Sequence, residues 1–322
     1  MARITSRSLR LCCLIAYPAI CPAQQSSGAP EQQLESAQLH LERLHAPEAL
    51  TTLVSERRWD EVLRVALRGL SETPGDPTLH YWAGVARFYQ RDLVAAVVSL
   101  RSAEKLRFDT APFHETLGIT YYAMHQYNLF LRQMEAAIRA DPASPAAYHY
   151  LGRYYEHDIN DYLKAISYFD KALERDAGDF KSLHFRAFCL QMLGRDGEAR
   201  AGYEAAIRRI EEGGERFGWP YQKMAESLIA TDLPAALRYA QKAVELEPAV
   251  ESNHLVLAKA YESAGNIDRA IQEYFEAARL KPNEPSIRYS LFRVYKKKGD
   301  HSAAAEQLKL HEKLTAIYAS SH

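Results

Sequence analysis

LAKAYESAGNIDRAIQEYFEAARLKP (residues 257–282) contains two helix-like segments separated by Gly265 and Asn266. On both sides of this break, small and aromatic residues recur three or four positions apart, which is the spacing of one helix face. Pro282 then closes the second segment, because proline cannot continue a helix. The stretch therefore predicts two helices joined by a short turn.

The same pattern recurs along most of the chain about every 34 residues, which is the spacing between Ala236 and Ala270. Three series of small or apolar positions keep this period. They are Val62, Ala96, Phe130, Ala165, Ala199, Ala236, Ala270 and Ala304; Gly69, Ala103, Ala137, Ala172, Ala206, Ala243, Ala277 and His311; and Gly84, Gly118, Gly152, Ala187, Met224, Ala258 and Phe292. A two-helix unit cannot bury its apolar side alone, so such units stack and share a continuous core.

The repeated unit resembles the tetratricopeptide repeat, a helix–turn–helix of about 34 residues. The residues that carry the resemblance include Leu117, Gly118, Tyr121, Ala137 and Pro142 in one unit and Ala258, Tyr261, Gly265, Ala270, Tyr274, Ala277 and Pro282 in another. The chain departs from the family pattern at Phe130 and at three unit ends, Phe108, Ala177 and Glu211. The resemblance implies an all-α fold, a right-handed α-solenoid superhelix of stacked helix pairs.

The period divides the chain as follows. Seven full units are expected at about 77–110, 111–144, 145–179, 180–214, 217–250, 251–284 and 285–318, after a degenerate helix pair at 47–76. Residues 24–46 are expected to form a linker and an amphipathic capping helix. One unit is three residues longer than the others, and the extra residues lie in AAIRRIEEGGERFGWP (205–220). We expect its second helix to continue through Glu212 and to end at Gly213 and Gly214, since paired glycines commonly end a helix.

The first 23 residues are typical of a secretory signal peptide. Three arginines and no acid precede an apolar run, Leu11–Ile20, and the chain then becomes small and polar, with Ala23 before Gln24. The run is too short to span a membrane. We expect export to the periplasm or the exterior; a lipid-anchored form and a mitochondrial presequence are the alternatives. Cleavage after Ala23 would leave Cys189 as the single cysteine, so no internal disulfide is expected.

No catalytic, cofactor or metal motif is found. The 40 basic and 41 acidic residues nearly balance, which argues against a nucleic-acid partner. The glycines of GGERFG (213–218) have the spacing of a phosphate loop, but Trp219 and Pro220 stand where lysine and serine or threonine would follow. His149, Arg153, Glu156 and His157 share one helix and are read as an ion pair with partner contacts rather than a metal site. We expect no enzyme and no cofactor.

The family resemblance implies that the first helix of each pair lines a concave groove. The solvent-facing positions by this resemblance are Tyr81, Val85, Phe88, Glu115, Ile119, Tyr122, His149, Arg153, Glu156, Lys181, His184, Phe188, Tyr221, Lys259, Tyr289 and Arg293. Aromatic and charged groups of this kind suit a peptide or helix of another protein. We therefore expect a non-catalytic protein-binding scaffold of the secretory route or cell envelope. The alternative is an exported glycan-binding or enzyme-accessory solenoid whose groove aromatics stack on sugars.

Overall fold

The computed structural model describes residues 48–320, and every regular element in that range is an α-helix. The helices are α2 (Glu48–Ser55), α3 (Trp59–Glu72), α4 (Pro77–Tyr89), α5 (Leu93–Lys105), α6 (Ala111–Ala123), α7 (Tyr127–Ala140), α8 (Ala146–His157), α9 (Tyr162–Arg175), α10 (Phe180–Met192), α11 (Asp196–Gly213), α12 (Trp219–Leu228), α13 (Leu233–Leu246), α14 (Glu251–Ser263), α15 (Ile267–Leu280), α16 (Pro285–Lys298) and α17 (His301–Ser320). The predicted all-α fold of repeated helix pairs is confirmed. The expected signal peptide and capping helix lie outside the described residues.

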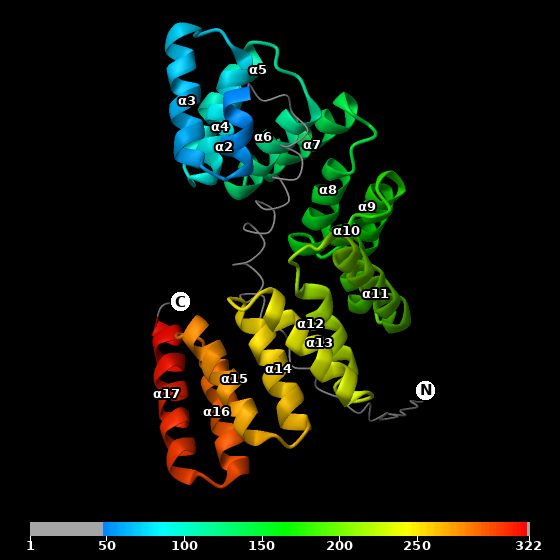
Figure 1. The fold of residues 1–322 in the computed structure, drawn as a ribbon, viewed down its shortest axis with the longest axis vertical. Helices are drawn as coiled ribbons and strands as arrows, with labels where there is room; N and C mark the ends of the chain where they lie inside the picture. The colour runs from blue at the N-terminus through cyan, green and yellow to red at the C-terminus, as the bar shows by residue number, and fades with distance from the viewer. Residues whose placement is uncertain (1–47, 321–322) are drawn as a thin grey trace, which may run out of the picture. The chain divides into compact units, whose positions relative to one another are not determined.

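The chain forms two compact units, one ending at Gln133 and the other beginning at Met134, so that their boundary falls within α7. From α2 to α6 in the first unit and from α8 to α17 in the second, each helix packs against the next one; in the second unit, α14 to α17 follow side by side (Figure 1). No helix within residues 48–320 is both long and apolar enough to cross a membrane.

The turn inside each helix pair has a repeated construction. The residue two positions before the second helix adopts a left-handed backbone in most pairs; these residues are Arg57, Arg91, His125, Asn160, Gly194, Gly265 and Gly299. The next residue is often an acid that caps the helix: Asp92 accepts a hydrogen bond from the Ala95 amide at 3.1 Å, and Asp161 accepts one from Lys164 at 3.0 Å. Such caps satisfy amide groups that the helix leaves unpaired.

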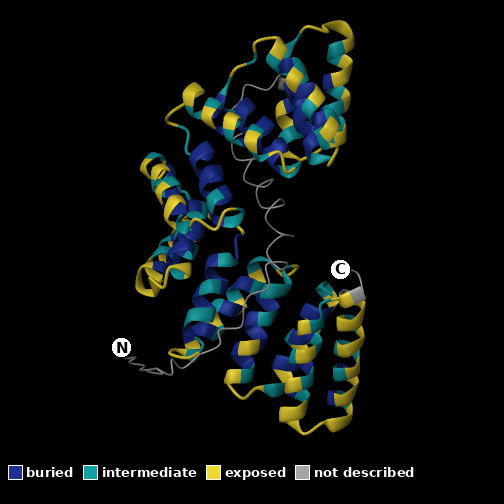
Figure 2. Cartoon of the chain, turned by 180° about the vertical axis from the view of Figure 1, so that it is seen from behind, coloured by how far each residue is buried: buried dark blue, intermediate teal, exposed yellow. Residues whose placement is uncertain are grey.

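The periodic small residues form the core between helices. Ala165, Ala172, Ala270 and Ala277 are all 0% exposed, and Phe130, the departure from the family pattern, is 2% exposed. Buried positions lie where neighbouring helices meet, whereas exposed positions occupy the outer surfaces (Figure 2). The sequence period therefore correctly marks helix contacts.

Two glycines of the first helices allow close approach of a bulky partner. A Cβ atom on Gly152 would lie 2.6 Å from Cε1 of Phe169, and one on Gly84 would lie 2.6 Å from Cγ of Leu100. Both distances are shorter than van der Waals contact. The missing side chain on one helix therefore provides the space that the large side chain on the other helix fills.

The long stretch at residues 205–220 is an ordered joint between α11 and α12. As predicted, α11 continues through Glu212, and Gly214 ends it with a left-handed φ of 68°. Arg216 Nη2 donates to the Leu246 carbonyl oxygen at 3.0 Å, and the Gly218 amide donates to Glu247 Oε2 at 2.7 Å. These two bonds fasten the joint to the end of α13.

Aromatic packing also holds the joint. The ring of Phe217 is 7% exposed and lies 5.4 Å from the ring of Phe180. Trp219 is half-buried, with its ring 6.1 Å from that of His184. Phe217 is therefore a packing residue of the joint.

Candidate functional site

The predicted groove residues of the first unit are buried rather than solvent-facing. They are Tyr81, Val85 and Phe88 on α4 and Glu115, Ile119 and Tyr122 on α6, each at most 6% exposed. The Tyr81 ring stacks 5.2 Å from Phe108, and its hydroxyl lies 3.3 Å from Thr116 Oγ1. Burial raises the pKa of this tyrosine. The expectation of solvent exposure is wrong here, because side chains such as Tyr81 pack against neighbouring segments of the chain instead of facing solvent.

The charged middle of the predicted groove is buried as well. His149, Arg153 and Glu156 on α8 are between 4% and 6% exposed. Arg153 forms the predicted ion pair with Glu156, and its guanidinium carbon lies 3.5 Å above the ring of Phe185 on α10. His149 Nδ1 lies 2.8 Å from Ser182 Oγ, also on α10. These groups join adjacent first helices instead of facing solvent.

His184 on α10 is the centre of an aromatic cluster. Its ring is 1% exposed and lies within 6.1 Å of the rings of Phe185, Tyr203, Phe217 and Trp219. Its Nδ1 atom has no hydrogen-bond partner within residues 48–320. Burial, with the positive charges of Lys223 and Arg153, holds the pKa of His184 well below its ordinary value. The imidazole is therefore neutral at physiological pH, and the predicted solvent-facing role does not hold.

The remaining predicted residues lie on the second unit and differ in exposure. Tyr221 on α12 is buried, and its hydroxyl donates to Glu211 Oε1 at 3.2 Å. The accessible ones are Lys181 and Phe188 on α10, Lys259 on α14, and Tyr289 and Arg293 on α16; we call these five residues the accessible face. The accessible face contains three cations and two aromatic rings.

Acidic groups near the accessible face are already paired with basic groups. Lys223 on α12 lies 2.9 Å from Glu226 Oε2 and 5.8 Å from the Phe188 ring centroid. Burial raises the pKa of the Glu226 carboxyl, but the Lys223 and Lys259 ammonium groups lower it. The lowering outweighs the effect of burial, so the net shift of the pKa is downward. Arg293 Nη2 lies 3.0 Å from Glu262 Oε2. The Glu226 carboxylate therefore stays ionised, and Glu226 and Glu262 are bound to Lys223 and Arg293, so neither binds Lys259 directly.

A recurrent histidine is the feature that the sequence reading overlooked. His80, His114 and His254 each lie four residues before a member of the third periodic series, in the first turn of a first helix. Each ring bonds to the segment before its helix: His80 Nε2 lies 2.9 Å from the Pro74 carbonyl oxygen, and His114 Nε2 lies 2.6 Å from Asp109 Oδ1. Their common position in the period was the available clue.

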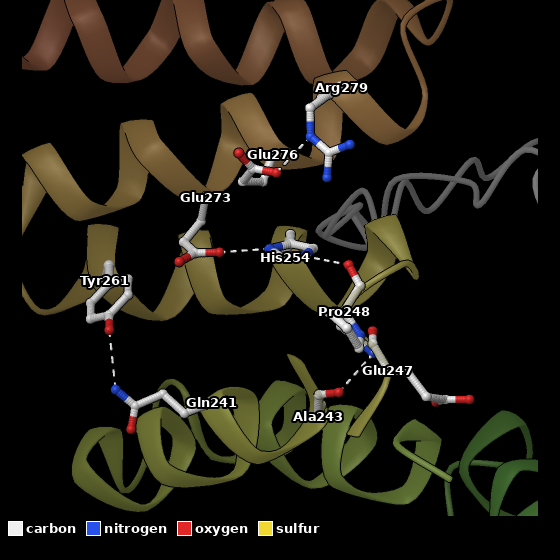
Figure 3. Close-up of polar contacts among 10 residues, drawn as sticks. Gln241, Ala243, Glu247, Pro248, His254, Tyr261, Glu273, Glu276 and Arg279 are labelled. Carbon is white, nitrogen blue, oxygen red and sulfur yellow. Dashed lines mark hydrogen bonds and ion pairs between the residues drawn. The ribbon is translucent and has the colours of Figure 1, made fainter. Parts of the chain in front are cut away.

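His254 contacts two neighbouring elements. The ring is 6% exposed; Nδ1 lies 2.7 Å from Glu273 Oε2 on α15, and Nε2 lies 3.0 Å from the Pro248 carbonyl oxygen (Figure 3). Nearby, Asn253 donates from Nδ2 to the Ala243 and Glu247 carbonyl oxygens, at 3.0 Å and 3.1 Å. Polar groups of α14 therefore bind the end of α13.

Among the described residues, we find no arrangement of side chains that suits chemistry other than binding. Within residues 48–320, no group of three or more His, Cys, Asp and Glu side chains lies close enough to hold a metal ion. Cys189 is buried, and burial raises the pKa of its thiol, so this side chain does not form a reactive thiolate.

Comparison with known proteins identifies the repeat. A family model described as tetratricopeptide repeat matches residues 116–180 and 230–285. The chain is 26% identical over 228 residues to Tetratricopeptide repeat protein 37 of Xenopus laevis, and 27% identical over 248 residues to Superkiller complex protein 3 of Homo sapiens. These alignments cover 67% and 73% of this chain but 14% and 15% of the relatives. The chain thus spans about one seventh of their length.

Solved structures share the fold. Cut9 in the Cut9–Hcn1 hetero-tetramer of APC/C superposes with a TM-score of 0.68 at 12% identity, over 85% of this chain and 57% of that one. Yeast Tom70 superposes with a TM-score of 0.57 at 17% identity, over 92% and 64%. The family model thus matches two segments of the chain, residues 116–180 and 230–285, as tetratricopeptide repeats, and the solved structures show a shared fold of stacked helix pairs.

Proposed function

We propose that this chain is a non-catalytic scaffold that binds another protein through first helices of its second unit. The observation that carries the proposal is the accessible face: Lys181, Phe188, Lys259, Tyr289 and Arg293 project from α10, α14 and α16. Arginine and aromatic side chains contribute strongly to protein interfaces because they combine large contact area with directional bonding.

The charge of this surface specifies the partner further. Glu226 and Glu262 are bound to Lys223 and Arg293, so the positive charge of Lys259 has no acid of its own at hydrogen-bonding distance within residues 48–320. We propose that carboxylates of an extended segment or helix of the partner meet this charge, since charge-assisted hydrogen bonds are the strong ones at such contacts.

The relatives support a role in assembly. Tetratricopeptide-repeat proteins generally mediate contacts between proteins. Cut9, whose fold is similar, occurs in a hetero-tetramer with Hcn1, and the mammalian relatives are named as components of the Superkiller complex. The glycan-binding alternative relied on open aromatic rings, but Tyr81 and Phe88, two of the rings expected to supply them, are buried; Phe188 and Tyr289 are the accessible aromatics among the predicted groove residues.

The place of action is proposed from the sequence. Residues 1–23 have the composition of a secretory signal peptide, so we propose that the scaffold acts in the secretory route or cell envelope. The mass of the mature protein checks this: export with cleavage gives Gln24 as its first residue, and an uncleaved chain contradicts it.

Charge reversal on the accessible face tests the scaffold proposal. We expect Lys259→Glu combined with Arg293→Glu to remove at least one partner captured from cells by the wild-type chain, or to weaken it roughly tenfold, because carboxylates would then face carboxylates. Arg238→Glu combined with Lys309→Glu, on exposed positions of the second helices α13 and α17, makes the same change in net charge and is the matched control. Identical partner sets from both double variants, at equal thermal stability, would reject the accessible face as the binding site.

A further inference from the structure

His254 connects three elements of the second unit. The ring belongs to α14, contacts Glu273 of α15 through Nδ1, and contacts the carbonyl of Pro248 in the α13–α14 turn through Nε2 (Figure 3). The two heavy-atom distances, 2.7 Å and 3.0 Å, are both in the range of good hydrogen bonds. Because the ring is buried, water does not replace either contact easily.

The two partners of the ring are both acceptors. A carboxylate oxygen and a backbone carbonyl oxygen cannot donate, and a neutral imidazole carries one N–H only. A neutral ring would therefore place an unprotonated nitrogen against an oxygen lone pair on one side. An imidazolium supplies two donors and satisfies both contacts.

We propose that His254 is a pH-sensitive clip: protonated, it fastens α14 both to α15 and to the α13–α14 turn, and when it loses its proton it releases one of the two. The clip is a property of the free chain and does not depend on the proposed partner.

The charges around the ring favour the protonated form. Glu273 faces it directly; Glu276 of α15 pairs with Arg279 at 2.8 Å, and Glu251 of α14 pairs with Lys281. On the side of the turn, the Glu247 carboxylate accepts the Gly218 amide. The hydrogen bond to Glu273 raises the pKa of His254, an effect that burial opposes only in part.

His114 provides an internal comparison in the first unit. Its Nδ1 lies 2.6 Å from Gln133 Oε1 and its Nε2 lies 2.6 Å from Asp109 Oδ1. The Gln133 amide can turn its NH2 group toward the ring, so both contacts can be satisfied by a neutral imidazole. At His254 neither oxygen has that option, and the requirement for a proton is specific to this member of the series.

The pH window follows from the sign of the shift. A folded-state pKa above the ordinary value of 6.5 means that the clip contributes fully below that pH. The contribution is lost as the pH rises through the folded-state pKa, when the ring loses its proton. The turn and the start of α14 should therefore open when the pH is above the folded-state pKa of His254, not when it is below.

Nuclear magnetic resonance titration of the full chain tests the clip directly. The ring signal absent from His254→Gln identifies His254, and its midpoint in the wild type is expected above 6.5. In Glu273→Gln, a nearly isosteric change, the midpoint should fall to 6.5 or below, because an amide replaces the negative partner. A wild-type midpoint at or below 6.5, or one that Glu273→Gln leaves unchanged, overturns the proposal.

Hydrogen exchange separates loosening of the clip from general unfolding. After correction for the intrinsic effect of pH, exchange of amides in residues 247–254 should rise severalfold in the wild type as the pH passes the measured midpoint. In His254→Gln it should be fast at every pH, whereas His114→Gln, the control in the other unit, should leave this segment as in the wild type. No rise across the midpoint in the wild type would show that the ring is not a clip.

Discussion

His184 and His254 are both buried in first helices of the second unit, yet their surroundings shift their protonation in opposite directions. His184 is enclosed by aromatic rings with Lys223 and Arg153 nearby, and burial lowers its pKa. His254 is bonded to Glu273, which raises its pKa. The hydrogen-bond partner, rather than burial itself, decides which form each site stabilises.

Acid should weaken the fold through His184. Because its folded-state pKa lies below the ordinary 6.5, the neutral form is retained without cost above that pH, and stability falls as the pH drops below it. Between pH 7.5 and 5.5 we expect the wild type to lose about 1 kcal/mol more than His184→Phe, whose ring fills similar space without titrating. Urea unfolding at the two pH values measures the difference. Equal losses of unfolding free energy in both proteins would show that His184 binds a proton as readily in the folded state as in the unfolded state.

At the residue scale, the sequence predicted recurrence better than exposure. Positions such as Ala165 and Ala270 repeat because a helix contact repeats, so their burial follows from the period. Tyr81 and His184 were assigned to solvent from the family register alone. Their burial depends on which side chain the neighbouring connection supplies, Phe108 between α5 and α6 for one and Phe217 between α11 and α12 for the other, and a single-chain pattern does not contain that pairing.

At the scale of elements, the turn within each pair imposes the same backbone on different residues. Gly265 holds a left-handed φ of 74° and would meet no atom within 4 Å if it carried a Cβ. Asn160 holds the corresponding position in another pair with a φ of 58°. Any loss of stability on substituting Gly265 therefore comes from the cost of the left-handed backbone rather than from a steric clash.

A substitution series at Gly265 should follow left-handed propensity. We expect Gly265→Asn to cost a few tenths of a kcal/mol, Gly265→Ala about 1 kcal/mol, and Gly265→Val more, since a β-branched residue is least tolerated there. Chemical denaturation of the three variants gives the order. If alanine were tolerated as well as asparagine, the backbone of the turn would have to differ from the one described.

The joint between α11 and α12 shows what element-scale reasoning can reach. The period located the extra residues, and the glycine pair correctly predicted the end of α11 at Gly213. The attachment was not predictable, because Arg216 and Gly218 bind the far end of α13, about 30 positions later in the chain. Contacts across that separation depend on the stacking of whole units, not on local preference.

At the scale of the whole molecule, the described residues of the second unit include two hydrophobic clusters that meet on the same helices. Met224 and Leu228 of α12 belong to the cluster that begins at α9, whereas Ala225 of α12 belongs to the cluster that continues through α16. Tyr239 packs against both. A disturbance of α12 should therefore reach both clusters, as expected where each repeat depends on its neighbours.

Gly218→Ala should expose this coupling. Its Cβ would lie 2.8 Å from Glu247 Oε2 and 3.0 Å from the Ala243 carbonyl oxygen, and a backbone oxygen yields little, so we expect a loss of about 1–3 kcal/mol. Hydrogen exchange should increase from α9 through α16 but not in the first unit. Gly213→Ala, whose nearest contact would be 3.4 Å from Glu215 Cγ, is the matched control and should exchange as the wild type. A change confined to α12 would mean that the two clusters are independent.

The pairing of Gly152 with Phe169 also constrains how this chain can evolve. The two positions share one volume, so a larger residue at the first is compatible only with a smaller residue at the second. A larger residue at position 152 alone would overfill the contact, and a smaller residue at position 169 alone would leave a cavity. Few single substitutions therefore connect the two compatible pairs. Descendants of this sequence should therefore inherit the two positions as a linked pair, and repeats that exchange places within the chain should carry both members with them.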